Sequence, residues 1–129
     1  MLDAPITRLA KDSYAGRLNL LVGGDLQVLE SVRDVLDEFT ENITHVGRLW
    51  DGHIMKLIHN FVSVGFMTLL AEAAAHENSQ RVDMKVFVNI LATGGFASTA
   101  LQRQSPYMLE RDAQSVPYSI TNAAKDIAY

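Results

Sequence analysis

The spacing of apolar residues divides this chain into a short α/β part and a longer helical part. Residues 18–22 form an apolar run before Gly23–Gly24, which predicts a buried strand that ends at the glycines. Asp25 is a favourable N-cap for a helix to about Phe39, and residues 42–47 predict a second short strand. Strand, helix and strand at this spacing predict a βαβ-like unit in a layered α/β sheet. The apolar face of the predicted helix consists of Leu26, Leu29, Val32, Val35, Leu36 and Phe39.

The two ends of the chain give weaker signals. The opening residues MLDAPITR predict the end of a strand and a turn, with Pro5 at the strand edge or just past it. The closing residues SITNAAKDIAY predict the start of a helix, with no stop signal before Tyr129. A strand needs neighbours and a helix needs an end, so we expect both termini to be cut from a longer protein.

The sequence after Gly47 predicts only helices. A long apolar helix is expected from about His53 to Asn78, after the loop RLWDG. A second helix follows Asp83 as N-cap and stops at Gly94–Gly95, and a third is expected to break at Pro106. The predicted fold class is therefore mainly α with a small β portion. The predicted domains are residues 1–47, the edge of an incomplete α/β domain, and residues 48–129, a helical domain.

Composition and charge exclude several classes of function. The chain is 48% hydrophobic and 20% charged, with a net charge of −4, so it has enough apolar material for a core. Without a Lys/Arg cluster, we expect neither nucleic-acid binding nor a polybasic membrane anchor. The absence of cysteine excludes disulfides and thiolate sites, and the N-terminus is not a signal peptide, so a cytoplasmic location is expected. Lys56, His59, Asn60 and Glu72 interrupt the longest apolar region, which predicts a buried helix rather than a membrane span.

The long helix begins with a polar stripe. Lys56, His59, Asn60 and Ser63 lie at offsets 0, 3, 4 and 7, which share one helix face. On spacing alone, a solvated face is the stronger interpretation. The remaining circumference is nevertheless apolar, and the stripe holds short polar groups with a single amine. A lysine in a partly buried cleft can act as general acid or anchor a carboxylate, and an asparagine amide can hold a substrate oxygen.

Two further candidates have weaker support. Lys125 follows Thr121 and Asn122 by one turn, although a plain surface lysine is the simpler interpretation. Thr7 and its neighbouring N–H groups, helped by Arg8, can bind an anion just after a strand, although a plain surface turn is the stronger interpretation. The chain has no G-x-G-x-x-G and no P-loop. The histidines make no metal-binding pattern, and they stand at positions 45, 53, 59 and 76.

A set of ordered motifs is more specific than any single one. The segments DAPITR, GRLNLLVGGD, ITHVG, GHIMKLIHNF, AEA and KD together resemble the second half of the β-hydroxyacid dehydrogenases, the 3-hydroxyisobutyrate dehydrogenase-like enzymes. The resemblance covers essentially the whole chain. It implies the end of a Rossmann domain followed by a helical domain like the C-terminal domain of 6-phosphogluconate dehydrogenase. It also implies NAD or NADP as cofactor, a small hydroxy acid as substrate, and a homodimer.

The resemblance carries roles onto single positions. The family pattern G-x-x-x-K-x-x-N-N corresponds here to Gly52, Lys56, His59 and Asn60. Lys56 matches the catalytic lysine, which handles the substrate hydroxyl proton, and Asn60 matches an asparagine that holds substrate. Lys125, seven residues after Tyr118, matches a lysine near cofactor and substrate.

The chain also departs from the family pattern. The family's D-A-P-V-S-G-G is here DAPITRL, so Thr7 keeps a hydroxyl while Arg8 and Leu9 replace both glycines. Those glycines let backbone amides approach a carboxylate, a role that Arg8 can take over, unless the substrate class differs. His59 replaces an asparagine and Trp50 stands where glycine is usual. The nucleotide-binding G-x-G-x-x-G is absent, so we expect little or no dehydrogenase activity from this chain alone.

Three hypotheses remain open at this point. The first is the catalytic and dimerisation half of an NAD(P)-dependent hydroxyacid dehydrogenase. The second is a non-enzymatic helical dimerisation or interaction module. The third is a small-molecule domain that binds an anion at Thr7 and Arg8. The first requires Lys56, Asn60 and Lys125 to face one cleft, whereas the second allows them to point to separate surfaces.

Overall fold

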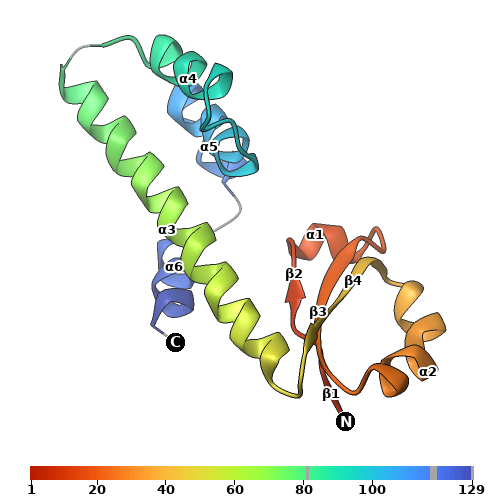
Figure 1. Ribbon diagram of the computed structural model, residues 1–129. Helices are drawn as coiled ribbons and strands as arrows, with labels where there is room; N and C mark the ends of the chain where they lie inside the picture. Colours follow the sequence, from red (N-terminus) through yellow and green to blue (C-terminus); the bar gives the residue numbers. More distant parts are fainter. Residues whose placement is uncertain (81, 117–118, 129) are drawn as a thin grey trace. The chain divides into compact units, whose positions relative to one another are not determined.

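The computed structural model of this chain describes residues 1–80, 82–116 and 119–128. It divides into two compact units, Met1–His59 and Asn60–Tyr129. Each unit is built around its own hydrophobic core. The elements, shown in Figure 1, are β1 (Leu2–Asp3), β2 (Ile6–Thr7), α1 (Ala10–Ser13), β3 (Leu18–Gly24), α2 (Leu26–Asp37), β4 (Thr40–Gly47), α3 (Asp51–Gln80), α4 (Met84–Thr93), α5 (Thr99–Glu110), the 3₁₀ helix η1 (Ala113–Ser115) and α6 (Ile120–Ile127).

The sheet of the first unit is built around β3. Strands β1 and β2 pair antiparallel with successive parts of β3, and β4 pairs parallel with it along its other edge. The parallel pair β3–β4, joined by α2, confirms the predicted βαβ unit. The strand ends at Gly24, as predicted, and both glycines of this end are paired with β1, Gly23 with Asp3 and Gly24 with Leu2.

Helix α2 forms where the sequence predicts it and contributes Leu29 and Leu36 to the first core. Its N-cap is Asp25, whose carboxylate accepts a hydrogen bond from the backbone N–H of Gln27 at 2.7 Å. Leu29 is completely buried and packs with Leu20 and Val22 of β3. This packing closes one face of the sheet, as Figure 1 shows for the helix beside β4.

The core of the second unit joins α3, α4 and α5. Its buried side chains are Leu70, Ala74, Val88, Leu101 and Met108. The predicted cap and stop of α4 are confirmed, since the Asp83 carboxylate accepts from the Lys85 N–H at 2.8 Å and the helix gives way at Gly94. Helix α6 begins after Ser119, whose hydroxyl caps the Asn122 N–H.

The predicted break at Pro106 is wrong, because α5 runs through this residue. Proline removes one backbone donor from the helix and crowds the preceding turn. The helix tolerates the loss because buried Leu101 and Met108 hold it on either side. The Ser105 hydroxyl also donates to the Leu101 carbonyl at 2.7 Å.

Helix α3 starts at Asp51, two residues earlier than predicted, and its apolar surface is mostly exposed. The prediction of a buried helix is therefore wrong for the single chain. Neighbouring elements cover only the stripe that contains Val64, Leu70 and Ala74. Asp51–His76 is long and apolar enough to cross a membrane by length and composition alone, so the absence of a membrane partner stays a prediction. The exposed apolar residues of α3 are Ile54, Met55, Leu57, Ile58, Phe61, Val62 and Leu69.

Candidate functional site

A buried carboxylate, that of Asp3 at the end of β1, holds the start of helix α3. One Asp3 oxygen accepts from the backbone N–H of Trp50 at 2.7 Å, and the other accepts from the backbone N–H of His53 at 2.8 Å. The second oxygen also lies 2.9 Å from His53 Nδ1. The first N–H groups of a helix have no partner within the helix, so this carboxylate satisfies them from another strand. Asp3 thereby fixes the helix turn that precedes Lys56.

Two glycines allow this close approach between the sheet and α3. A Cβ atom on Gly23 would lie 2.5 Å from the Arg48 carbonyl oxygen and 2.5 Å from Asp3 Oδ1. A Cβ on Gly52 would lie 2.5 Å from the Leu21 carbonyl oxygen and 2.6 Å from Asp3 Oδ2. Only hydrogen fits at either position, so the first turn of α3 rests directly on the backbone of β3.

The Asp3 carboxylate is ionised because its contacts outweigh its burial. Burial of the carboxyl would by itself raise its pKa. The hydrogen bond from the His53 side chain and those from the N–H groups of Trp50 and His53 act in the opposite direction, and the net pKa of Asp3 lies below its ordinary value of 3.8. At neutral pH, Asp3 is therefore an acceptor for all three donors.

Two residues at which the family pattern has glycine lie in left-handed backbone. Arg8 has φ 81° and Trp50 has φ 79°. A side chain in this region is strained, which explains why glycine suits both positions. Each departure has a compensating contact, since Arg8 forms an ion pair with Glu41 and the Trp50 N–H donates to Asp3. Trp50 is 59% exposed, and the centroid of its ring lies 5.9 Å from that of the His53 ring.

Replacing Trp50 tests this strain. We expect Trp50→Gly to be more stable than Trp50→Ala by about 1 kcal/mol, because only glycine adopts φ 79° without cost. Amide hydrogen exchange of β3 measures the free energy of opening of this unit in each variant. Equal protection in the two variants would show that position 50 carries no strain.

The polar stripe lies on α3 as its spacing predicts. Lys56, Asn60 and Ser63 are half-buried, whereas His59 is exposed. Lys56 and His59 belong to the first unit and Asn60 begins the second, so the unit boundary crosses the helix inside the stripe. The polar stripe was expected to be the solvent-exposed face of the helix, and this is wrong in the single chain. The neighbouring apolar residues of α3 are more exposed than Lys56, Asn60 and Ser63.

The predicted anion corner differs from expectation in its details. Thr7 lies within β2 rather than after a strand, pairs with Asn19 and is 7% exposed. The Arg8 guanidinium is bound to the Glu41 carboxylate of β4, which a ligand anion would have to displace. A surface ion pair contributes little stabilising free energy, so a ligand anion can replace Glu41 as the partner of Arg8 at small cost.

Lys125 lies on α6 in the second unit. Its ammonium is 2.9 Å from the carboxylate of Asp126, and its side chain is 59% exposed. Tyr118, which helped to align Lys125 with the family pattern, lies outside the described residues, as does Tyr129. The assignment of Lys125 to a cofactor site stays a prediction.

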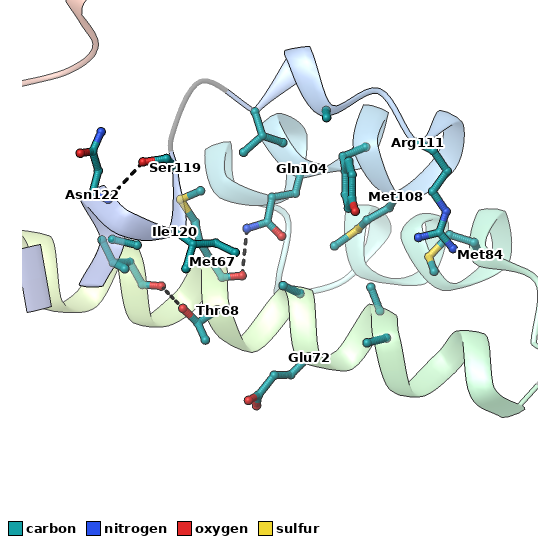
Figure 2. A pocket seen from close by; sticks show the side chains of 18 residues that line it. Met67, Thr68, Glu72, Met84, Gln104, Met108, Arg111, Ser119, Ile120 and Asn122 are labelled. Atoms are coloured by element: carbon teal, nitrogen blue, oxygen red, sulfur yellow. Dashed lines mark hydrogen bonds between the residues drawn. The ribbon is translucent and has the colours of Figure 1, made fainter. Parts of the chain in front are cut away.

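A pocket of about 1230 Å³ lies within the second unit, among α3, α4, α5, η1 and α6 (Figure 2). Most of its lining is apolar, and Figure 2 shows Met67, Met84 and Met108 around it. Gln104, 7% exposed, donates from Nε2 to the Met67 carbonyl oxygen at 2.9 Å. Neither Asn60 nor Lys125 is among its lining residues. The pocket offers an apolar surface but none of the groups predicted to move a proton.

Metal chemistry has no support in the described part of the chain. Within residues 1–80, 82–116 and 119–128, no group of three His, Cys, Asp or Glu side chains comes together.

Sequence reasoning missed the role of Asp3. The residue stands in the quoted segment DAPITR, but its partners Trp50 and His53 are 47 and 50 positions away. The contact depends on the pairing of β1 with the glycine end of β3. A possible signal was the pair of glycines, Gly23 and Gly52, each beside a predicted element boundary.

Comparison with known proteins adds the family context. Residues 1–47 match the family described as the NAD binding domain of 6-phosphogluconate dehydrogenase. The NAD-dependent L-serine dehydrogenase of Pseudomonas aeruginosa is 31% identical over 92% of this chain and 41% of its own length. The 3-hydroxyisobutyrate dehydrogenase of the same organism is 28% identical over 83% of this chain and 36% of its own length.

Solved structures show the same fold. The Mycobacterium tuberculosis 3-hydroxyisobutyrate dehydrogenase with L-serine has a TM-score of 0.86, with 23% identity over 98% of this chain and 46% of that one. Psf3 in complex with NADP+ and 2-OPP has a TM-score of 0.77, with 21% identity over 97% of this chain and 44% of that one. These matches confirm the predicted fold class, an edge of a Rossmann sheet followed by a helical domain.

The chain spans about two fifths of the curated relatives that it matches. Its first 47 residues match the NAD-binding domain of 6-phosphogluconate dehydrogenase, and its relatives are 3-hydroxyisobutyrate dehydrogenases and other hydroxyacid dehydrogenases.

Proposed function

We propose that this chain is the catalytic and dimerisation part of an NAD(P)-dependent oxidoreductase that oxidises the hydroxyl of a short hydroxy acid. The observation that carries the proposal is the similarity over 92% of the chain to an NAD-dependent L-serine dehydrogenase. On the resemblance of its motif to the family pattern, Lys56 is proposed as the catalytic lysine. Lys56 is half-buried and lies one turn after the start of α3, which Asp3 fixes through its hydrogen bond with the His53 N–H.

Lys56 is the proposed proton-transfer group. Oxidation of a hydroxyl removes a hydride from carbon and a proton from oxygen, and a positioned amine is a suitable proton carrier. Asn60 follows one turn later on α3 and is proposed to hold the substrate through its amide, with His59 beside it.

The remaining roles concern the substrate carboxylate and the cofactor. Thr7 and Arg8 are proposed to bind the carboxylate, with Arg8 leaving Glu41 when substrate enters. Lys125 is proposed to contact the cofactor. The cofactor supplies the hydride acceptor, and its phosphates require a glycine-rich turn that the 129 residues do not contain. We therefore propose that another segment provides nucleotide binding and that the isolated chain is inactive.

A chimera tests the proposed reaction. The nucleotide-binding region of the Pseudomonas aeruginosa L-serine dehydrogenase is joined before this chain, and NAD+ reduction is measured with L-serine and 3-hydroxyisobutyrate. We expect activity, and we expect Lys56→Met to lower kcat by about a hundredfold or more. Lys11→Met, at an exposed lysine of α1, serves as the matched control and keeps full activity. A folded chimera that acts on no hydroxy acid, or whose Lys56→Met variant stays active, contradicts the proposal.

The isolated chain gives a second measurement. Titration of NADH or NADPH into the chain, followed by nucleotide fluorescence, is expected to show no saturable binding. Saturable binding at micromolar concentration would contradict the proposal that nucleotide binding lies in another segment.

We also propose that the chain forms a homodimer through α3. Its exposed apolar side chains include Phe61 at 67%, Val62 at 63% and Leu69 at 60%. Patches of this kind mark interaction surfaces, and the same observation favours the alternative of a purely structural dimerisation module. Sedimentation at micromolar concentration is expected to show a dimer, and Val62→Glu is expected to dissociate it. A wild-type monomer at that concentration would rule the dimer out, whereas activity of the chimera separates the enzyme from the structural module.

A further inference from the structure

The pocket of the second unit is not used by the proposed reaction, and it has the form of a groove. Its lining on α3 runs from Val64 to Ala75, a length of about 16 Å along the helix axis. The facing wall is α5 with Gln104, Met108 and the C-cap Arg111, which lie at offsets 0, 4 and 7 and share one helix face. We call this space the α3–α5 groove. Its volume of about 1230 Å³ exceeds the roughly 300–1,000 Å³ of ordinary small-molecule pockets.

The surface of the groove is apolar and adaptable. Ala71 and Ala75 keep the α3 side low, so another backbone can approach it closely. Met67, Met84 and Met108 line the groove from three different helices (Figure 2). Methionine is unbranched and flexible, and it is common on surfaces that receive helical peptides. The groove therefore suits an elongated apolar occupant that lies along α3.

One buried polar side chain in the groove has an acceptor without a donor. Gln104 is 7% exposed, and its Nε2 donates to the Met67 carbonyl oxygen at 2.9 Å. This bond fixes the orientation of the amide, because only its nitrogen can donate to a carbonyl. Among the residues that the structure describes, no donor reaches Gln104 Oε1. A buried acceptor without a donor costs free energy, so an occupant that displaces water from the groove has to bring one.

Arg111 places a positive charge at one end of the groove. It is exposed, and no carboxylate in the described part of the chain forms an ion pair with it. Glu72 also lines the groove, but Figure 2 shows its carboxylate pointing away from α5. Arg111 follows Gln104 by two helical turns, about 10 Å along the axis. An acidic group two turns from the hydrogen-bond donor therefore complements this end of the groove.

We propose that the α3–α5 groove binds an amphipathic helix of a partner protein. This helix carries apolar side chains at i, i+3 and i+7, an amide or hydroxyl donor for Gln104 and an acidic residue for Arg111. A helix satisfies its own backbone groups, whereas an extended peptide would bring unpaired N–H and C=O groups into an apolar groove. The inference goes beyond the proposed function and does not rest on it, because neither Lys56 nor Asn60 lines the groove.

Binding is measured on the full chain with a synthetic helical probe. The probe is a fluorescein-labelled, alanine-based peptide of about 18 residues, with leucine at i, i+3 and i+7, glutamine at i+4 and glutamate at i+11. Fluorescence anisotropy is expected to show saturable binding with a Kd of about 10 μM. Ala71→Glu, at an exposed alanine of the groove, is expected to weaken binding about tenfold or more, because the probe would bury the new carboxylate. Val62→Glu, at an exposed residue of α3 outside the groove, is the matched control and keeps the binding.

A second probe tests the acceptor. It has leucine in place of the glutamine and brings no donor to Gln104 Oε1. We expect the wild-type chain to prefer the glutamine probe about tenfold, and we expect Gln104→Met to lose this preference. The preference compares two probes on one protein, so a general loosening of the groove does not produce it.

Several results would overturn the inference. One is a wild-type chain that binds neither probe at high micromolar concentration, and another is equal affinity for the two probes. If Ala71→Glu rather than Val62→Glu dissociates a dimer of the chain in sedimentation, the groove holds a second copy instead. Decanoate that displaces the probe at micromolar concentration would place a small apolar acid there instead of a helix.

Discussion

Gly52→Ala is expected to destabilise the first unit by about 3 kcal/mol, an effect of overpacking rather than of backbone strain. The new Cβ would lie 2.5 Å from the Leu21 carbonyl oxygen, 2.6 Å from Asp3 Oδ2 and 3.1 Å from the Gly23 nitrogen. None of these is the flexible end of a surface side chain. The helix start has to move away from β3, and the Asp3 hydrogen bonds lengthen with it. Amide hydrogen exchange of Leu20 and Val22 measures the loss.

Gly65→Ala is the matched control on the same helix. A Cβ at Gly65 meets nothing within 4 Å, so the change removes only the backbone entropy cost of glycine in a helix interior. We expect it to stabilise α3 by about 0.8 kcal/mol. Two substitutions of identical chemistry in one helix then have opposite signs. If Gly52→Ala is as harmless as Gly65→Ala, the direct contact between β3 and α3 does not exist in solution.

Local signals predicted most of the fold. Asp25 and Asp83 cap α2 and α4 as expected, because an N-cap depends only on the residue and its next few neighbours. The parallel pairing of β3 and β4 followed from the strand–helix–strand order. The failures lie where distant contacts decide. Pro106 stays inside α5 because the packing of buried residues outweighs one lost hydrogen bond, which the sequence around it does not show.

The candidate site was predicted in part for the same reason. The stripe of Lys56, Asn60 and Ser63 is a matter of helical spacing, and spacing is visible in a sequence. Trp50 and Arg8 were recognised only as departures from a glycine pattern. Their left-handed backbone is visible only in the folded structure, and it explains why the family has glycine at these two positions. The role of Asp3 was missed, because it depends on the pairing of β1 with β3 and on the helix start 47 residues later.

Asp3→Ala is expected to destabilise the first unit by about 3 kcal/mol at neutral pH, because it leaves buried donors without an acceptor. The backbone N–H groups of Trp50 and His53 both lose their partner. Asp3→Asn keeps the shape and one acceptor but turns an amide donor toward the others, and we expect a loss of about 2 kcal/mol. Glu30→Gln is the control, since Glu30 is also a carboxylate that accepts hydrogen bonds, here from Arg33, but lies on the exposed face of α2, where we expect little change.

The pH dependence of the Asp3 contribution has a definite sign. The pKa of Asp3 in the folded unit lies below its ordinary value of 3.8 because the hydrogen bonds from His53 and from two backbone N–H groups outweigh the effect of burial. A carboxyl of this kind stabilises the fold fully above its ordinary pKa, and the stabilisation is lost as pH falls through the lower folded pKa. The difference in stability between wild type and Asp3→Ala should therefore be constant near neutral pH and should narrow only below pH 3.8. Urea unfolding at a series of pH values measures it, and a difference that narrows already near neutral pH would mean that Asp3 is not the ionised anchor of α3.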